Sequence, residues 1–231
     1  MQVLFKDIVA SDIDKVRQRL AKDPDAANLV ATAPPKQFAG MSPLQVCYHK
    51  GAYEIAALLL DHGADPNFCD LNPFDNFGMP VLHSATGAAV ANSRWLRRTG
   101  PPHRDPEWEL AKTAEKADAA FDALQRPLDA GADISATNTH GGSALGFAAN
   151  QARQYLPRCK YGDPEWVDPK PLNDELVDDL NRIFDLLLAH GADPAGVEPP
   201  FGKPLVECFA AEPVGRFLAR PAATRNSDTR R

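Results

Sequence analysis

Apolar residues recur along most of this chain at intervals of three and four, the spacing that places them on one face of a helix. Near the start, the stripes are formed by Leu4, Phe5, Ile8 and Val9 and then by Ile13, Val16 and Leu20. The pattern predicts a helix pair over residues 4–23, with Asp12 as the N-cap of the second helix. Further helices are predicted over residues 43–50, 53–61, 81–92, 106–129 and 144–155, and from residue 173 onward.

The second helix of each later pair ends in the same phrase. It reads LLLDHGADPN at residues 58–67, PLDAGAD at 127–133 and LLLAHGADP at 186–194. The glycine stands where a helix end requires a positive φ, which glycine adopts without strain, and the aspartate starts a turn. A second phrase precedes the first helix of each pair and begins at Gly40, Gly78, Gly141 and Gly202.

Turn, helix, helix, glycine and turn, in this order, resemble the ankyrin repeat. The resemblance covers most of residues 1–220 and implies an all-α fold, a single ankyrin-repeat solenoid domain of about five helix-pair repeats. The expected repeats span approximately residues 1–30, 38–67, 75–135, 138–195 and 199–220, followed by a disordered tail at 221–231. Leu82 and Leu145 should be buried at equivalent positions of successive inner helices.

Two of the repeats are longer than the family norm of about 33 residues. The opening glycines lie 38, 63 and 61 residues apart, so the third and fourth repeats each carry roughly 30 extra residues. No further opening or closing phrase lies in either gap, which argues against a hidden repeat. We therefore expect long insertions between the inner and outer helices of repeats three and four, where Asp105-Pro106-Glu107 and Asp163-Pro164-Glu165 each favour a helix start.

The two insertions resemble each other and are basic in an acidic chain. Residues 91–104 contain four arginines, residues 151–162 contain three basic residues, and neither stretch has an acidic residue. Such a surface would favour an acidic partner, and arginine, tryptophan and tyrosine are enriched at binding hot spots. The candidate partner-binding residues here are Arg94, Trp95, Arg97, Arg98, Arg153, Tyr155, Arg158 and Tyr161. An alternative stays open, in which the arginines neutralise nearby acids such as Asp178 and Asp179 and the aromatic residues brace the helices.

The resemblance also implies a concave face, made of the loops and the inner helices, that binds a partner protein. The candidate contact residues on this face are Tyr48, His49, Phe74, Phe77 and His140, with Met41, Gln45, Asn76 and Met79 beside them. His83 falls at a position where the family has a hydrogen-bonding histidine, so a structural role is expected for it.

Composition narrows the classes of function. The 231 residues carry a net charge of −6, which disfavours nucleic acid as a partner. No apolar run approaches about 20 residues, so no membrane span is expected, and the N-terminus lacks the apolar core of a signal peptide. The four cysteines show no metal-ligand spacing and are expected to be reduced thiols of a cytoplasmic, monomeric protein.

These observations predict a non-catalytic protein–protein interaction module, with an inhibitor or immunity protein as one role and a secreted, host-directed effector as an alternative. The usage of alanine, arginine and proline is typical of bacterial proteins. A second alternative is an enzyme whose acid and base are insertion carboxylates such as Asp105 and Glu107, with His103 beside them. No nucleophile elbow, phosphate-binding loop, dinucleotide turn or metal motif occurs, so no cofactor or metal is expected.

Overall fold

The computed structural model describes residues 2–33, 35–101, 103–157 and 170–219 with their side chains, and residues 159–160 and 163–167 as backbone. The predicted tail at 221–231 lies outside the described residues, and so do the predicted contact residues Arg158 and Tyr161. Helices are the main regular secondary structure of the described chain, and short antiparallel hairpins connect some of them.

The first helix pair forms where the apolar stripes predict it, as α1 (Val3–Val9) and α2 (Ile13–Lys22). Asp12 caps α2 as predicted, because its Oδ1 accepts a hydrogen bond of 3.1 Å from the backbone N–H of Lys15. The connection to the next pair contains two 3₁₀ turns, η1 (Pro24–Asn28) and η2 (Lys36–Phe38).

The second pair, α3 (Pro43–Lys50) and α4 (Tyr53–Asp61), has the predicted bounds. Ser42 and Gln45 form a reciprocal capping box at the start of α3, in which each side chain accepts from the backbone N–H of the other. Gly51 ends α3 in the left-handed conformation, with a φ of 69°.

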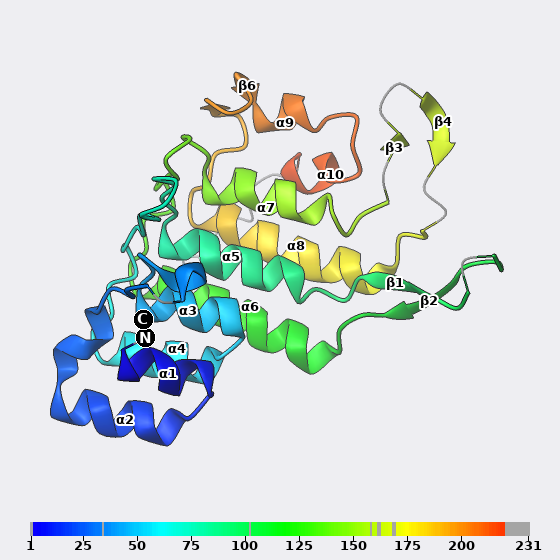
Figure 1. Ribbon diagram of the computed structural model, residues 1–231. Helices are drawn as coiled ribbons and strands as arrows, with labels where there is room; N and C mark the ends of the chain where they lie inside the picture. Colours follow the sequence, from blue (N-terminus) through cyan, green and yellow to red (C-terminus); the bar gives the residue numbers. More distant parts are fainter. Residues whose placement is uncertain are drawn as a thin grey trace, which may run out of the picture.

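The remaining helices continue two rows that run through the molecule (Figure 1). They are α5 (Val81–Ala91), α6 (Ala114–Asp129), α7 (Ala144–Ala152), α8 (Asp174–Ala189), α9 (Leu205–Cys208) and α10 (Gly215–Leu218). In the inner row α1, α3, α5 and α7 each contact the next helix, and in the outer row α2, α4, α6 and α8 do the same. Each inner helix also packs against the outer helix that follows it in the chain.

A continuous apolar core lies between the two rows, and its buried residues run from Leu4 to Leu218. Leu82 and Leu145 are each the second residue of their helix, α5 and α7, and each is 1% exposed. Both are therefore buried at matching positions, as predicted. Burying a leucine side chain stabilises a fold by roughly 1.5–3 kcal/mol, so these matched layers hold neighbouring inner helices together.

An asparagine side chain joins successive loops at two places. Asn28 donates to the carbonyl oxygen of Gly63 (2.9 Å) and accepts from the backbone N–H of Asp65 (2.8 Å). Asn67 repeats both contacts one loop later, with Gly131 (3.1 Å) and Asp133 (2.7 Å). These asparagine clamps satisfy backbone groups at two successive helix ends, which would otherwise lack partners within their own helices.

The helix predicted over residues 106–129 is wrong in its first part. Residues 107–110 form strand β2 (Glu107–Leu110), which pairs antiparallel with β1 (Leu96–Thr99), and α6 begins at Ala114. The sequence Glu-Trp-Glu-Leu alternates polar and apolar residues, as a strand does, and its pairing with β1 overrides the local helix preference of Asp105-Pro106-Glu107.

The helix start predicted at Asp163 is wrong for the same reason. Residues 163–167 form β4 (Asp163–Val167), which pairs with β3 (Cys159–Lys160), and α7 ends at Ala152 instead of near residue 155. A third hairpin joins β5 (Val197–Glu198) to β6 (Lys203–Pro204). Figure 1 shows the β1–β2 and β3–β4 hairpins leaving the helical rows at one end, opposite the loops that precede α5 and α7.

Candidate functional site

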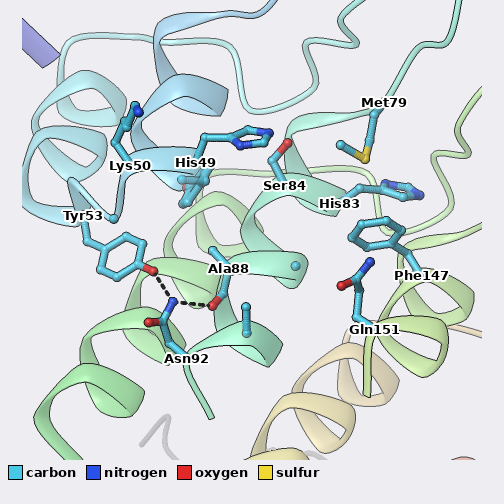
Figure 2. Close-up of a pocket in the computed structure, with 14 residues that line it drawn as sticks. His49, Lys50, Tyr53, Met79, His83, Ser84, Ala88, Asn92, Phe147 and Gln151 are labelled. Atoms are coloured by element: carbon cyan, nitrogen blue, oxygen red, sulfur yellow. Dashed lines mark hydrogen bonds between the residues drawn. The ribbon is translucent and has the colours of Figure 1, made fainter. Parts of the chain in front are cut away.

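A groove of about 450 Å³ crosses the inner helices α3, α5 and α7 (Figure 2). Its lining residues are Tyr48, His49, Lys50, Gly51, Tyr53, Met79, His83, Ser84, Gly87, Ala88, Ala91, Asn92, Phe147 and Gln151. We call this feature the inner groove. Its size falls in the range of small-ligand pockets and side-chain anchor sites.

The floor of the inner groove is low because α5 carries small residues on one face. Ser84, Gly87, Ala88 and Ala91 are spaced by three, four and seven residues from the first, so they form one stripe along the helix. A Cβ atom on Gly87 would lie 2.9 Å from Cε1 of Phe147. The glycine therefore lets the Phe147 ring lean over α5 and form one wall.

The opposite wall is held by a small hydrogen-bond network. Asn92 Nδ2 donates to the Tyr53 hydroxyl (3.0 Å) and to the Ala88 carbonyl oxygen (2.9 Å), and Figure 2 shows both bonds closing one end of the groove. Burial raises the pKa of Tyr53 to about 12, so its phenol is neutral at physiological pH. The Tyr53 ring is therefore held between α4 and α5 by contacts within the chain, and a bound partner protein is not needed to position it.

His83 has the structural role predicted for it. Its Nε2 lies 3.0 Å from the carbonyl oxygen of Gly142, and its ring packs 5.6 Å from the Phe147 ring. Burial lowers the pKa of His83, which favours the neutral ring. Because a carbonyl only accepts, Nε2 carries the proton and Nδ1 is left as an acceptor. Neither Nδ1 of His83 nor Oγ of Ser84 has a hydrogen-bond partner among the described residues.

The loop before α5 extends this surface beyond the groove. Asp70 accepts from the backbone N–H of Met79 (2.6 Å), and Gln45 donates to the Met79 carbonyl (2.7 Å), so the loop is tied to α3. Phe74 at its tip is 55% exposed, and the Phe77 ring lies 5.2 Å from the ring of His140 on the next loop. The fold thus brings together two of the predicted contact residues.

The two predicted contact residues on α3 have different surroundings. Tyr48 is 4% exposed, and its hydroxyl donates to the Ala123 carbonyl on α6 (3.3 Å), so it supports the groove from beneath. His49 is exposed on the groove rim, where partial burial lowers its pKa. His49 is therefore the better placed of the two to touch a partner.

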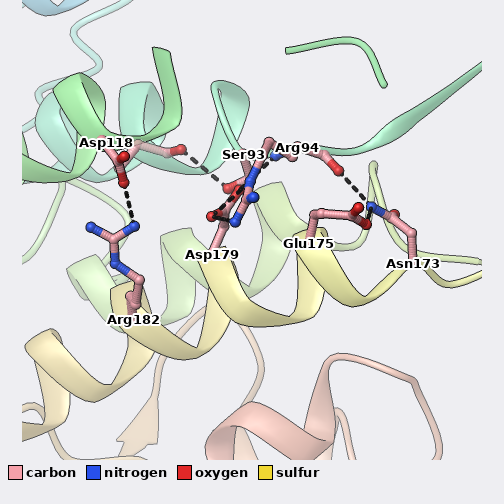
Figure 3. Close-up of polar contacts among 8 residues, drawn as sticks. Ser93, Arg94, Asp118, Asn173, Glu175, Asp179 and Arg182 are labelled. Atoms are coloured by element: carbon pink, nitrogen blue, oxygen red, sulfur yellow. Dashed lines mark hydrogen bonds and ion pairs between the residues drawn. The ribbon is translucent and has the colours of Figure 1, made fainter. Parts of the chain in front are cut away.

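Arg94, a predicted contact residue, lies in an internal ion pair at the root of the β1–β2 hairpin (Figure 3). The carboxylate of Asp179 on α8 accepts from its backbone N–H (2.8 Å), from Nε (3.0 Å) and from Nη2 (2.8 Å). Asn173 also donates to the Arg94 carbonyl oxygen (2.8 Å). Arg94 therefore fastens the hairpin to the outer row.

The roots of the two insertions contact each other, as their similarity suggests. The Trp95 ring lies 5.1 Å from the Tyr155 ring, which joins the chain after α5 to the chain after α7. Lys170 donates to the Tyr155 carbonyl (2.5 Å) and lies 5.4 Å from the centre of the Trp95 ring. These aromatic residues pack the insertions together close to the helices.

Three further insertion arginines have partners within the chain. Arg97 pairs with Glu109 across the hairpin, and Arg98 donates to the carbonyl oxygen of Arg104 (3.1 Å). Arg153 pairs with Glu212. For the described residues, the contacts thus agree with the bracing role that the sequence left open.

The family comparison falls on the second helix pair. Residues 39–71, which contain α3 and α4, match the family model for the ankyrin repeat. This segment of the chain is similar to an ankyrin repeat. Ankyrin repeats generally mediate protein–protein interaction, and the family is typically non-catalytic. No curated protein matches the chain.

The described part of the chain contains neither a metal-binding cluster nor a membrane-spanning helix. Among its described residues, no group of three or more His, Cys, Asp or Glu side chains could hold a metal ion. No described helix has the length and apolarity needed to cross a bilayer. Asp105, Glu107 and His103 are exposed on the β1–β2 hairpin, away from the inner groove.

Sequence reasoning missed the residues that shape the inner groove. Ser84, Gly87, Ala88 and Ala91 were not among the predicted contact residues. Their signal is four small residues at helical spacing on the inner helix α5, flanked in space by aromatic residues of α4 and α7.

Proposed function

We propose that this protein is a non-catalytic binding module whose inner groove and neighbouring loops hold a partner protein. The contacts between successive inner helices and between successive outer helices support a solenoid of about five helix-pair repeats. In this arrangement the third and fourth repeats carry their insertions, as hairpins, between inner and outer helices.

The inner groove carries this proposal. It combines a floor of small residues with aromatic walls, and such concave, water-excluding sites are where interface hot spots cluster. Met79 lines the groove, and two residues earlier the Phe77 ring packs at a tilt against the His140 ring. The exposed Phe74 lies on the same loop, so one partner could cover the groove and the loop tips together.

An acidic partner at the insertions is the alternative surface. It has less support, because Arg94, Arg97 and Arg153 each have an acidic partner within the chain. We propose that these arginines mainly brace the hairpins and that the exposed side chains of the hairpin tips add at most a rim contact. Exposed ion pairs contribute about 0–1 kcal/mol, whereas charges at a rim mainly change the association rate.

The biological role depends on the partner. An inhibitor, an immunity protein and a host-directed effector would each use the same surface, so identification of the captured protein distinguishes them. Cys47, Cys69 and Cys208 are free thiols, which supports the proposed cytoplasmic location. An enzyme that uses the insertion carboxylates has no support from the described geometry.

Site-specific photocrosslinking in the native cell tests the proposal. A photoreactive residue at Gln151, on the groove wall, should capture a defined partner that reappears with the same residue at Phe74. The matched controls are His103 on the β1–β2 hairpin and Asp178 on the exposed side of α8. Capture confined to His103 would move the binding surface to the insertions, and equal capture at all four positions would argue against any defined surface.

A further inference from the structure

Two buried polar atoms of residues that line the inner groove make no hydrogen bond with a described residue. They are Oγ of Ser84, whose side chain is 8% exposed, and Nδ1 of His83, which is fully buried. Both residues line the groove, and Figure 2 shows the Ser84 hydroxyl on the side of His49 and Met79. Buried polar groups are nearly always paired in folded proteins, so these two atoms suggest the chemistry of what enters the groove.

The two atoms require different hydrogen-bonding groups from a ligand. Nε2 of His83 donates to Gly142, so Nδ1 can only accept a hydrogen bond and the ligand must bring a donor. The Ser84 hydroxyl can donate one hydrogen bond and accept others. A ligand group that both donates and accepts would satisfy both residues.

The surroundings exclude a charged donor. None of the described residues that line the groove carries a carboxylate, and Lys50 adds a positive charge at the rim. An ammonium or guanidinium group would therefore lose its hydration without gaining a counter-charge from the lining residues. The nearby Asp70 carboxylate already accepts from the backbone N–H of Met79. The donor must be uncharged.

The shape of the groove indicates what carries this donor. Gly87, Ala88 and Ala91 form a flat apolar floor between the rings of Tyr53 and Phe147. Aromatic rings pair favourably when their centres lie about 4.5–7 Å apart, and buried phenols and indoles usually hydrogen-bond through their polar ends. An aromatic ring with an uncharged polar group fits both the floor and the two acceptors.

We propose that the inner groove binds a tyrosine side chain presented by the partner protein. The phenol ring lies over Gly87, Ala88 and Ala91, and the hydroxyl donates to His83 and accepts from Ser84. Tyrosine fits better than tryptophan, whose indole N–H donates but cannot accept. This inference rests on the proposed function, because it names the side chain that anchors the partner.

NMR titration of the full chain with small probes tests the inference directly. The probes are phenol and N-acetyl-tyrosinamide, each compared with a probe that lacks the hydroxyl, toluene and N-acetyl-phenylalaninamide. The hydroxyl probes should shift the amide signals of the residues that line the groove and bind about three- to tenfold more tightly, the effect of one net hydrogen bond. Equal affinities within each pair would overturn the inference.

Two variants make the test specific. Ser84→Ala should reduce the preference for phenol over toluene, while Ala88→Leu should fill the groove and abolish the shifts from all four probes. Ala114→Leu adds the same bulk at an exposed position on α6 and should bind like wild type. An unchanged preference in Ser84→Ala, or probe binding that survives Ala88→Leu, would contradict the assignment.

The inference and the proposed function can fail separately. If the photocrosslink from Gln151 captures a partner through a segment without tyrosine, the groove binds protein but the tyrosine assignment is wrong. If phenol binds in the groove and no partner is captured at Gln151 or Phe74, the proposed function is wrong and the pocket is a site for small phenols.

Discussion

The guanidinium of Arg94 lies against the carboxylate of Asp179, 85 residues away in the sequence, and the Arg94 backbone N–H donates to the same carboxylate. The Asp179 side chain is 4% exposed and that of Arg94 is 22% exposed, so this ion pair is largely removed from water. A buried pair of this kind specifies where a segment must lie, because displacing either partner leaves a charge without compensation. Here it sets the position of the β1–β2 hairpin relative to α8.

Removing one partner of this pair should destabilise the protein strongly. Arg94→Ala leaves the Asp179 carboxylate buried without its counter-charge, so we expect the free energy of unfolding to fall by about 3–5 kcal/mol. Urea denaturation followed by circular dichroism measures the change. Arg97→Ala is the matched control, because the Arg97–Glu109 pair is exposed and its loss should cost less than about 1 kcal/mol. Equal losses in the two variants would show that burial of the first pair does not matter.

The matched core leucines should tolerate truncation poorly. Leu82→Ala and Leu145→Ala each leave a cavity between neighbouring inner helices and should each cost about 2–5 kcal/mol. The same denaturation measurement applies. Leu71→Ala, on the exposed loop before α5, should change stability by less than about 0.5 kcal/mol. A small loss at Leu82 or Leu145 would mean that the site collapses around the smaller side chain.

Gly40 should resist substitution more than Gly51. Both have positive φ, 90° and 69°, so alanine at either costs about 1–2 kcal/mol of backbone strain. At Gly40 the new Cβ would also lie 2.3 Å from the Leu71 carbonyl oxygen, whereas nothing lies within 4 Å at Gly51. Gly40→Ala should therefore lose about 1–3 kcal/mol more than Gly51→Ala, the usual cost of overpacking. Equal melting-curve shifts would show that the loop moves aside freely.

Stability should fall in mild acid, and His83 should contribute to the fall. Its pKa in the folded protein is lowered from the ordinary 6.5 by burial, so below that pH the unfolded chain binds a proton that the folded chain excludes. The stabilisation is complete above pH 6.5 and is lost as the pH drops toward the folded pKa, by at most about 1.4 kcal/mol per pH unit. Denaturant unfolding between pH 7.5 and 5.5 measures the slope.

His83→Gln is the comparison for this slope. Glutamine can still donate to the Gly142 carbonyl but does not titrate, so the variant should show a shallower dependence on pH. His49, whose pKa is also lowered by burial, and Asp70, whose pKa is raised by burial, are present in both proteins and cancel in the difference. Identical slopes would show that His83 becomes protonated without unfolding.

Local sequence signals predicted the helices well where a cap and a glycine mark both ends. α3 begins at the capping box of Ser42 and Gln45 and ends at Gly51, and its predicted bounds agree with the structure. The β1–β2 hairpin was missed because its stability depends on pairing across a turn, which short-range preferences do not report. Asp105-Pro106-Glu107 is a good helix start in isolation, and only the strand opposite it changes the outcome.

The candidate site was harder to predict than the fold. His49 was expected on this face and lines the groove, and the rings of Phe77 and His140 contact each other on neighbouring loops. The groove itself exists because α5 has no bulky side chains at Gly87, Ala88 and Ala91. In the sequence, these three residues look like ordinary residues of a helix. The unpaired atoms of His83 and Ser84 depend on neighbours up to 59 residues away, which no local pattern contains.

The two asparagine clamps make the same contacts over very different lengths of chain. From Asn28 to Gly63 there are 35 residues, and from Asn67 to Gly131 there are 64, yet each asparagine grips its glycine carbonyl in the same way. The additional residues between Asn67 and Gly131 therefore do not alter the contacts of the asparagine clamp. A fluorescent reporter inserted at the turn around Gly100 should therefore leave both asparagine clamps intact, because the chain already carries an insertion there.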